Sequence, residues 1–153
     1  MRWARLAALG LIVGAIAAVV VIRMQPSGPQ QWTQEEAARQ LQQMAEPVSR
    51  DLSTLAALPA TATVSDWVSA CRSLSTSNAA YLTALENGRW DPAVQPYVDK
   101  VIEGVRGTQG WYDQCRRTSS LAGIDALGPI SARIPDANAT ANLREQLGLS
   151  PTP

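Results

Sequence analysis

Two cysteines are the residues of this 153-residue chain whose chemistry is easiest to define, and histidine is absent. Cys71 and Cys115 each end the same pattern, Trp-x-x-x-Cys-Arg, in which Trp67 and Trp111 come four residues earlier. Two cysteines can contribute to a metal site, exchange thiols with a substrate, or form a structural bridge. Their spacing and their places in the predicted helices favour the structural bridge.

A metal site and a redox site both need surroundings that this sequence does not supply. A closed zinc site needs four ligands, usually Cys or His, but the two cysteines stand alone, 44 positions apart. Catalytic cysteine pairs usually lie close together at a helix N-terminus, where the helix dipole stabilises a thiolate. Cys115 is predicted near the C-terminal end of its helix. We therefore expect no metal and no cofactor, and a thiol–disulfide redox protein is kept only as an alternative.

The disulfide interpretation follows from the depth of each cysteine in its helix. The two helices are joined by a short loop, so they should be antiparallel neighbours. Cys71 lies about 22 Å from the loop and Cys115 about 28–34 Å, at about 1.5 Å per helical residue. These depths agree to within a turn or two. We predict an intramolecular Cys71–Cys115 disulfide, which also requires an oxidising compartment.

The helices that must position the cysteines can be delimited from their start and stop signals. Thr33 and Glu36 form a capping box that starts a helix over 34–57, bent at Pro47. A second helix begins near Ser65 and ends at Gly88, which we expect to be a left-handed cap.

The third helix follows Asp91 and Pro92, or starts properly at Gln95, and runs to about Thr118. The C-terminal part has short apolar turns and a final helix capped by Asp136. The expected fold class is all-α: three main helices, antiparallel neighbours, with short C-terminal helical segments and one interhelix disulfide.

The N-terminal sequence predicts a membrane anchor. Leu6–Ile22 is an uncharged, almost wholly apolar run that would span about 25 Å as a helix, at the short end for a bilayer. A signal peptide cleaved after Ala15-Ile16-Ala17 is the alternative, but it would leave an apolar stub on the mature chain. Arg2 and Arg5 precede the run, which favours a cytoplasmic N-terminus and an extracytoplasmic C-terminal domain.

The expected organisation therefore has five parts. These are a cytoplasmic N-terminus (1–5), a transmembrane signal anchor (6–23), a linker (24–31), a helical bundle domain (32–147) and a flexible tail (148–153).

Charge and the anchor together indicate the partners to expect. Residues 24–153 contain all 13 acidic residues but only ten of the 13 basic ones, a net charge of −3. This balance disfavours nucleic acid, which is bound through a basic surface. The expected partners are the lipid bilayer, through residues 6–22, and a protein of the envelope. Gly10 and Gly14 form a small-xxx-small pair that could bring two anchors together as a homodimer.

Two sets of residues are candidates for packing or for interaction. The four tryptophans of the domain, Trp32, Trp67, Trp90 and Trp111, either pack in the core or form an aromatic surface for a partner. The second set, Gly104, Gly107 and Gly110, lies three residues apart on one narrow strip of the third helix. Such a strip permits close approach of a neighbouring backbone or of a ligand.

The sequence contains no motif of a known catalytic machinery, and without histidine it lacks the commonest acid–base residue. We expect a non-enzymatic accessory, scaffold or interaction subunit of a bacterial cell-envelope complex, anchored in the cytoplasmic membrane by a single span. A module for a small apolar ligand or lipid is the second interpretation. Exposed tryptophans would favour the subunit, and an apolar cavity beside Gly104–Gly110 would favour the ligand module.

Overall fold

The structure is a computed structural model that describes residues 30–152. The predicted anchor over 6–23, with Gly10 and Gly14, lies outside these residues, as does nearly all of the predicted linker. Between residues 30 and 152 no helix is both long enough and apolar enough to cross a membrane.

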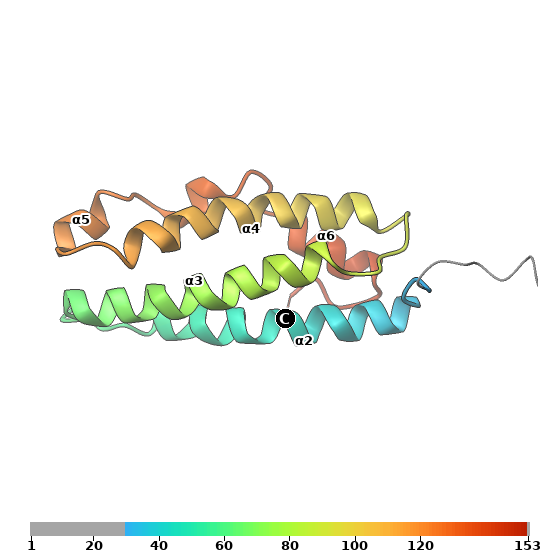
Figure 1. Ribbon diagram of the computed structural model, residues 1–153, viewed down its shortest axis with the longest axis horizontal. Coiled ribbons are helices and arrows are strands. Elements are labelled where there is room, and N and C mark those ends of the chain that lie inside the picture. Colours follow the sequence, from blue (N-terminus) through green and yellow to red (C-terminus); the bar gives the residue numbers. More distant parts are fainter. Residues whose placement is uncertain (1–29, 153) are drawn as a thin grey trace, which may run out of the picture. The chain divides into compact units, whose positions relative to one another are not determined.

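The described part of the chain is all-α, as predicted. Its long helices are α2 (Gln34–Ala56), α3 (Val64–Glu86) and α4 (Gln95–Cys115). They lie side by side with alternating direction, and α3 is between the other two (Figure 1). Three short elements follow, α5 (Leu121–Asp125), the 3₁₀ turn η1 (Ile130–Arg133) and α6 (Ala139–Gln146).

Capping boxes start the first two long helices. The predicted box at α2 is confirmed, since the Glu36 amide donates to the Thr33 hydroxyl and the Thr33 amide to the Glu36 carboxylate. A second box, Thr63 with Asp66, starts α3 close to the predicted Ser65. Pro47 does not split α2, which is assigned as one helix through to Ala56.

The prediction that Gly88 forms a left-handed cap is wrong. Asn87 caps α3, and the described glycines with positive φ are Gly128 and Gly148. Gly88 is needed for a different reason: a Cβ at this position would collide with the indole ring of Trp90. Its missing side chain therefore makes room for a buried tryptophan.

The other predicted helix boundaries are close to those observed. Asp91 accepts a hydrogen bond from the Ala93 amide at 2.8 Å, in the turn before α4 begins at Gln95. Asp136 likewise accepts from the Asn138 amide at 2.9 Å, but Asn138 and not Asp136 is the N-cap of α6. Asp136 therefore shapes the turn that precedes α6 and does not cap the helix itself.

Part of the C-terminal segment that we expected to be flexible is tied to α6. The guanidinium of the buried Arg144 donates to the carbonyl oxygens of Ser150 at 2.6 Å and Thr152 at 3.2 Å. Gly148, with φ 72°, turns the chain back toward Arg144 after α6.

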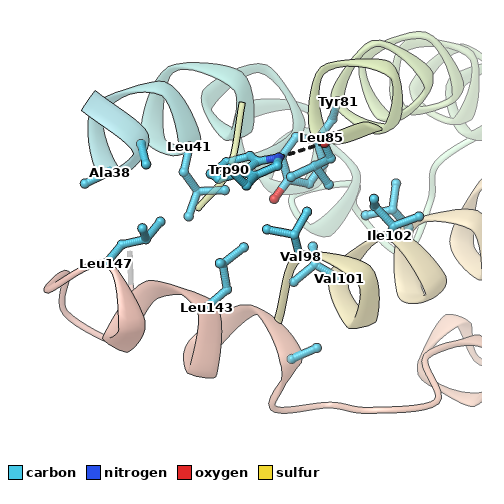
Figure 2. Packing of buried hydrophobic residues seen from close by; sticks show 13 residues of the cluster. Ala38, Leu41, Tyr81, Leu85, Trp90, Val98, Val101, Ile102, Leu143 and Leu147 are labelled. Carbon is cyan, nitrogen blue, oxygen red and sulfur yellow. Dashed lines mark hydrogen bonds between the residues drawn. The ribbon is translucent and has the colours of Figure 1, made fainter. Parts of the chain in front are cut away.

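The core has two parts. The larger, which we call the proximal cluster, joins the N-terminal half of α2, the end of α3, the start of α4, and α6. Figure 2 shows Leu143 of α6 and Leu147, the residue that ends this helix, facing Leu41 of α2 and Val98 of α4. The smaller, which we call the disulfide cluster, lies toward the opposite end of α3 and α4. Its buried members are Cys71, Leu74, Trp111, Tyr112 and Cys115.

The glycine strip of α4 yields a prediction with its own control. A Cβ on Gly107 would collide with the backbone carbonyl of Arg133 in η1, whereas one on Gly110 would meet open space. We expect Gly107→Ala to destabilise the fold by about 1–3 kcal/mol through overpacking. Gly110→Ala should stabilise it by up to about 1 kcal/mol, because alanine has the higher helix propensity. Chemical denaturation of both variants checks this, and equal effects would contradict the close approach of η1.

Candidate functional site

The predicted disulfide is present. The sulfur atoms of Cys71 and Cys115 are 2.02 Å apart, and the Cα atoms are 5.9 Å apart. Both residues are fully buried in the disulfide cluster. The bridge ties α3 to α4 at the end where the buried core is smaller.

The two tryptophans of the repeated pattern have different environments. Trp111 is buried in the disulfide cluster, and its Nε1–H donates to the carbonyl oxygen of Gly128 at 3.0 Å. Trp67 is only half-buried and lines a shallow depression with Leu121 and Ile124 of α5. The shared pattern Trp-x-x-x-Cys-Arg therefore does not give the two tryptophans one role.

Trp32 and Trp90 form a pair in the proximal cluster. Their ring centroids are 5.0 Å apart at an interplanar angle of 86°, an edge-to-face contact. Trp90 is buried, and its Nε1–H donates to the Leu85 carbonyl oxygen at 2.8 Å (Figure 2). The Arg89 guanidinium lies 5.9 Å from the ring centroid of Trp32. The four tryptophans therefore occupy three separate places and do not form a single aromatic surface.

A polar network joins α3 to α4. The Ser75 hydroxyl donates to Asp113 at 2.7 Å, Arg116 donates to the same carboxylate at 2.9 Å, and Gln109 donates to the Ser75 hydroxyl at 3.2 Å. The hydrogen bond from Ser75 has the largest effect on Asp113 and that from Arg116 the next largest, and both hold the pKa of Asp113 below its usual value of 3.8. The network requires the ionised carboxylate.

This depressed pKa predicts an acid dependence of stability. A carboxyl group whose pKa is lower in the folded state stabilises the fold above about pH 4, and this contribution is lost as the pH falls through the folded-state pKa. The capping boxes also lower the pKa of Glu36 and of Asp66, so these two carboxylates contribute to the same loss of stability in acid. We expect the free energy of unfolding to fall between about pH 5 and pH 2, and Asp113→Asn to show a shallower fall. Urea denaturation at several pH values tests this, and identical slopes would contradict it.

The glycine strip lies against the C-terminal segment, not against a long helix. Gly107 contacts the backbone of η1, and a Cβ on Gly104 would stand 3.7 Å from the Ile134 side chain, an ordinary contact. Gly110 has free space in front of it. The predicted close approach therefore holds at Gly107, and Gly104 borders a cavity.

This cavity, which we call the central groove, lies between the two clusters and has a volume of about 210 Å³. Its walls come from α2, α3, α4 and the segment from η1 to α6. Leu52 and Ile134, two of the large apolar side chains that are exposed (40% and 38%), lie on it. The Lys100 ammonium, 3.8 Å from the Asp136 carboxylate, adds an ion pair beside them. The lining residues are Val48, Leu52, Asn78, Tyr81, Lys100, Val101, Gly104, Val105, Thr108, Tyr112, Ile130, Ile134, Asp136, Ala139 and Thr140.

Three buried polar side chains of the groove have unused hydrogen-bonding capacity. Asn78, Tyr81 and Tyr112 are only 3%, 7% and 2% exposed. The amide nitrogen of Asn78 donates to the Val105 carbonyl and to Gln109, both at 3.0 Å. Within residues 30–152, no hydrogen bond involves the side-chain oxygen of Asn78 or the hydroxyl of either tyrosine. In the same residues, every side-chain nitrogen or oxygen that is fully buried has a hydrogen-bond partner. All three residues line the central groove.

Burial raises the pKa of Tyr81 and of Tyr112 to about 12, although Arg144 opposes the shift at Tyr81. Both phenols therefore stay neutral at physiological pH, and each hydroxyl can donate and accept one hydrogen bond. Sequence reasoning missed these residues, because Tyr81 and Tyr112 stand among the apolar positions of their helices.

A second depression, between α2 and α3, is larger, and most of its lining residues are charged or carry a hydroxyl group. Its volume is about 500 Å³, and it is lined by Arg50, Asp51 and Arg72 with small hydroxyl residues. Arg50 is paired with the adjacent Asp51 at 3.4 Å and is largely exposed. This surface has the character of a solvated helix face, where ion pairs contribute little.

The described residues thus define a class of protein: a helical bundle joined by one buried disulfide, with an apolar groove at its middle. In residues 30–152 no three Cys, Asp or Glu side chains are grouped so that they could hold a metal ion. Comparison with protein-family models, with curated proteins and with solved structures gives no significant match.

Proposed function

We propose that this protein is a non-enzymatic accessory subunit of a bacterial cell-envelope complex, held at the cytoplasmic membrane by residues 6–22, with its helical domain outside the cytoplasm. The central groove is its contact site for a partner protein. The observation that carries this proposal is an apolar groove with two exposed large apolar side chains, Leu52 and Ile134, beside it. Apolar groups gathered around a concavity are typical of interaction sites.

The disulfide supports the compartment in this proposal. Structural disulfides form and persist in oxidising compartments and are rare in the cytoplasm. Cys71 and Cys115 are bridged across two helices, so a domain that matures outside the cytoplasm accounts for the bond. The same bond speaks against the redox alternative, because exchange requires access to a sulfur atom and both residues are fully buried.

The volume of the groove helps to choose between a partner protein and a small ligand. Sites for drug-sized ligands usually enclose about 300–1,000 Å³, and the central groove offers about 210 Å³. A single large side chain needs less room than a whole ligand. Binding energy in protein interfaces is concentrated in such buried anchors. The ligand module, which a cavity beside Gly104 would favour, is therefore the second candidate.

Co-purification with matched variants tests the proposal. Leu52→Glu and Ile134→Glu place a charge beside the groove at positions that are already exposed, so the fold should tolerate them. Leu121→Glu makes the same change at a side chain that is 45% exposed on α5, away from the groove. We expect a partner protein to co-purify from membranes with the wild type and Leu121→Glu, and to be lost from the two groove variants. Retention by all three variants, or no partner at all, would contradict the proposal.

A further inference from the structure

The end of α3 carries the dipeptide Asn87-Gly88, the one place in the chain where glycine follows asparagine. Asparagine is among the thermolabile residues, and Asn87 is exposed. Glycine has no Cβ, so its amide nitrogen can approach the preceding asparagine side chain with little steric hindrance. Packing requires the glycine, because a Cβ on Gly88 would collide with the indole ring of Trp90. The core therefore fixes a reactive neighbour next to Asn87.

Hydrogen bonds hold the dipeptide at the end of the helix. The side-chain amide of Asn87 donates to the Thr83 carbonyl oxygen at 2.8 Å. The Gly88 amide donates to the Leu85 carbonyl oxygen at 3.4 Å, longer than the usual range of about 2.7–3.2 Å. The Trp90 indole donates to the same oxygen at 2.8 Å (Figure 2). The Gly88 amide is thus weakly held, and a small opening of the last turn releases it.

We propose that Asn87 is a site of spontaneous deamidation, and that local opening of the end of α3 sets its rate. Helix ends open at low free-energy cost. In the open turn the Gly88 nitrogen loses its proton and attacks the side-chain carbonyl carbon of Asn87. A carbon–nitrogen bond forms, the bond from this carbon to Nδ2 breaks, and ammonia leaves with the released proton. Water then opens the resulting succinimide ring at either carbonyl, which gives aspartate or isoaspartate.

Either product changes the connection between α3 and α4. Both place a negative charge at the C-terminal end of α3, which the helix dipole disfavours. Isoaspartate also inserts an extra carbon atom into the main chain directly before Gly88, whose backbone lies against the Trp90 indole. We therefore expect the modification to loosen the edge-to-face contact of Trp32 with Trp90 and to lower the stability of the proximal cluster.

Peptide mapping by mass spectrometry measures deamidation at each asparagine. The full-length protein in detergent solution is incubated in mildly alkaline buffer, either folded or in guanidinium chloride. Asn87 should convert faster than Asn138, an exposed asparagine that alanine follows. Unfolding should speed the reaction at Asn87 by at least about fivefold, the usual worth of one hydrogen bond. Conversion no faster than at Asn138 would overturn the site, and equal rates in folded and unfolded protein would overturn control by α3.

A neighbouring ion pair provides a variant that tests the control by local opening. Arg106 of α4 donates to the Glu86 carboxylate at 2.7 Å and so ties the last turn of α3 to α4. Arg106→Ala should speed deamidation of folded Asn87 by about 1.5-fold to fivefold, the range for loss of an exposed ion pair. Arg50→Ala, which removes an exposed pair on α2, is the matched control. No acceleration by Arg106→Ala, or the same acceleration in guanidinium chloride, would overturn the control.

The stability of aged protein tests the consequence. Protein enriched in isoaspartate should unfold at a lower denaturant concentration than fresh protein, and also lower than Asn87→Asp, which adds the charge without the extra main-chain carbon. Asn87→Gln keeps an amide but lengthens the side chain, so it should age without this loss. Equal stability of aged and fresh protein, or an equal loss in Asn87→Gln, would overturn the effect of deamidation on the proximal cluster.

Discussion

Replacing Cys71 and Cys115 together by alanine is expected to lower the free energy of unfolding by about 4 kcal/mol. The bridge closes a loop of 44 residues, and in the chain-entropy model a loop of this length is worth about that amount. The loss should be felt strongly because the disulfide cluster has only three other buried side chains, Leu74, Trp111 and Tyr112. For a domain of this size, such a change is a large part of the total stability.

Chemical denaturation of the wild type and the double alanine variant, each with and without reductant, measures this effect. The wild type should lose stability with reductant only after the chain has been unfolded, because the sulfur atoms are buried in the native state. The alanine variant should not respond to reductant. A difference of less than about 1 kcal/mol between wild type and variant would contradict a stabilising role for the bridge.

Trp90→Ala should produce a loss of similar size, about 3–5 kcal/mol, because it empties the centre of the proximal cluster. The indole packs edge-to-face on Trp32, fills the space left by Gly88 and donates to the Leu85 carbonyl. Trp90→Phe keeps a ring but removes the donor, so it should cost about 1–3 kcal/mol for the unpaired carbonyl and lost contacts.

Trp67→Ala is the matched control for Trp90. Trp67 is half-buried and belongs to neither core cluster, so its replacement should cost about 1 kcal/mol. Urea denaturation of the three variants gives the order of their effects. Similar losses for Trp67→Ala and Trp90→Ala would show that the proximal cluster does not depend on the buried indole.

Features that depend on neighbours along the chain could be predicted from the sequence. The capping box at Thr33, the start of α4 at Gln95 and the pairing of Cys71 with Cys115 all follow from local signals and helix lengths. The Gly88 prediction failed because a glycine after a helix usually supplies a left-handed cap, whereas here it is required by Trp90, two residues further on. Competition between backbone and packing requirements is not visible in a local pattern.

The central groove could be anticipated only in part. The glycine strip indicated that something approaches α4 closely, and Gly107 does contact η1. The part of Asn78, Tyr81 and Tyr112 in lining the groove could not be foreseen, because all three stand among apolar positions of their helices. The groove depends on how the segment from η1 to α6 covers α2 and α4, and the order of residues does not encode that placement locally.

Site-specific photo-crosslinking in native membranes tests the central proposal most directly. A photoreactive amino acid at position 52, beside the central groove, is compared with one at position 121 on α5, which is similarly exposed. The account predicts a crosslink to one protein partner from position 52, abolished by Ile134→Glu, and none to that partner from position 121. Crosslinks to lipid alone, or the same products from both positions, would contradict a groove that receives a partner protein.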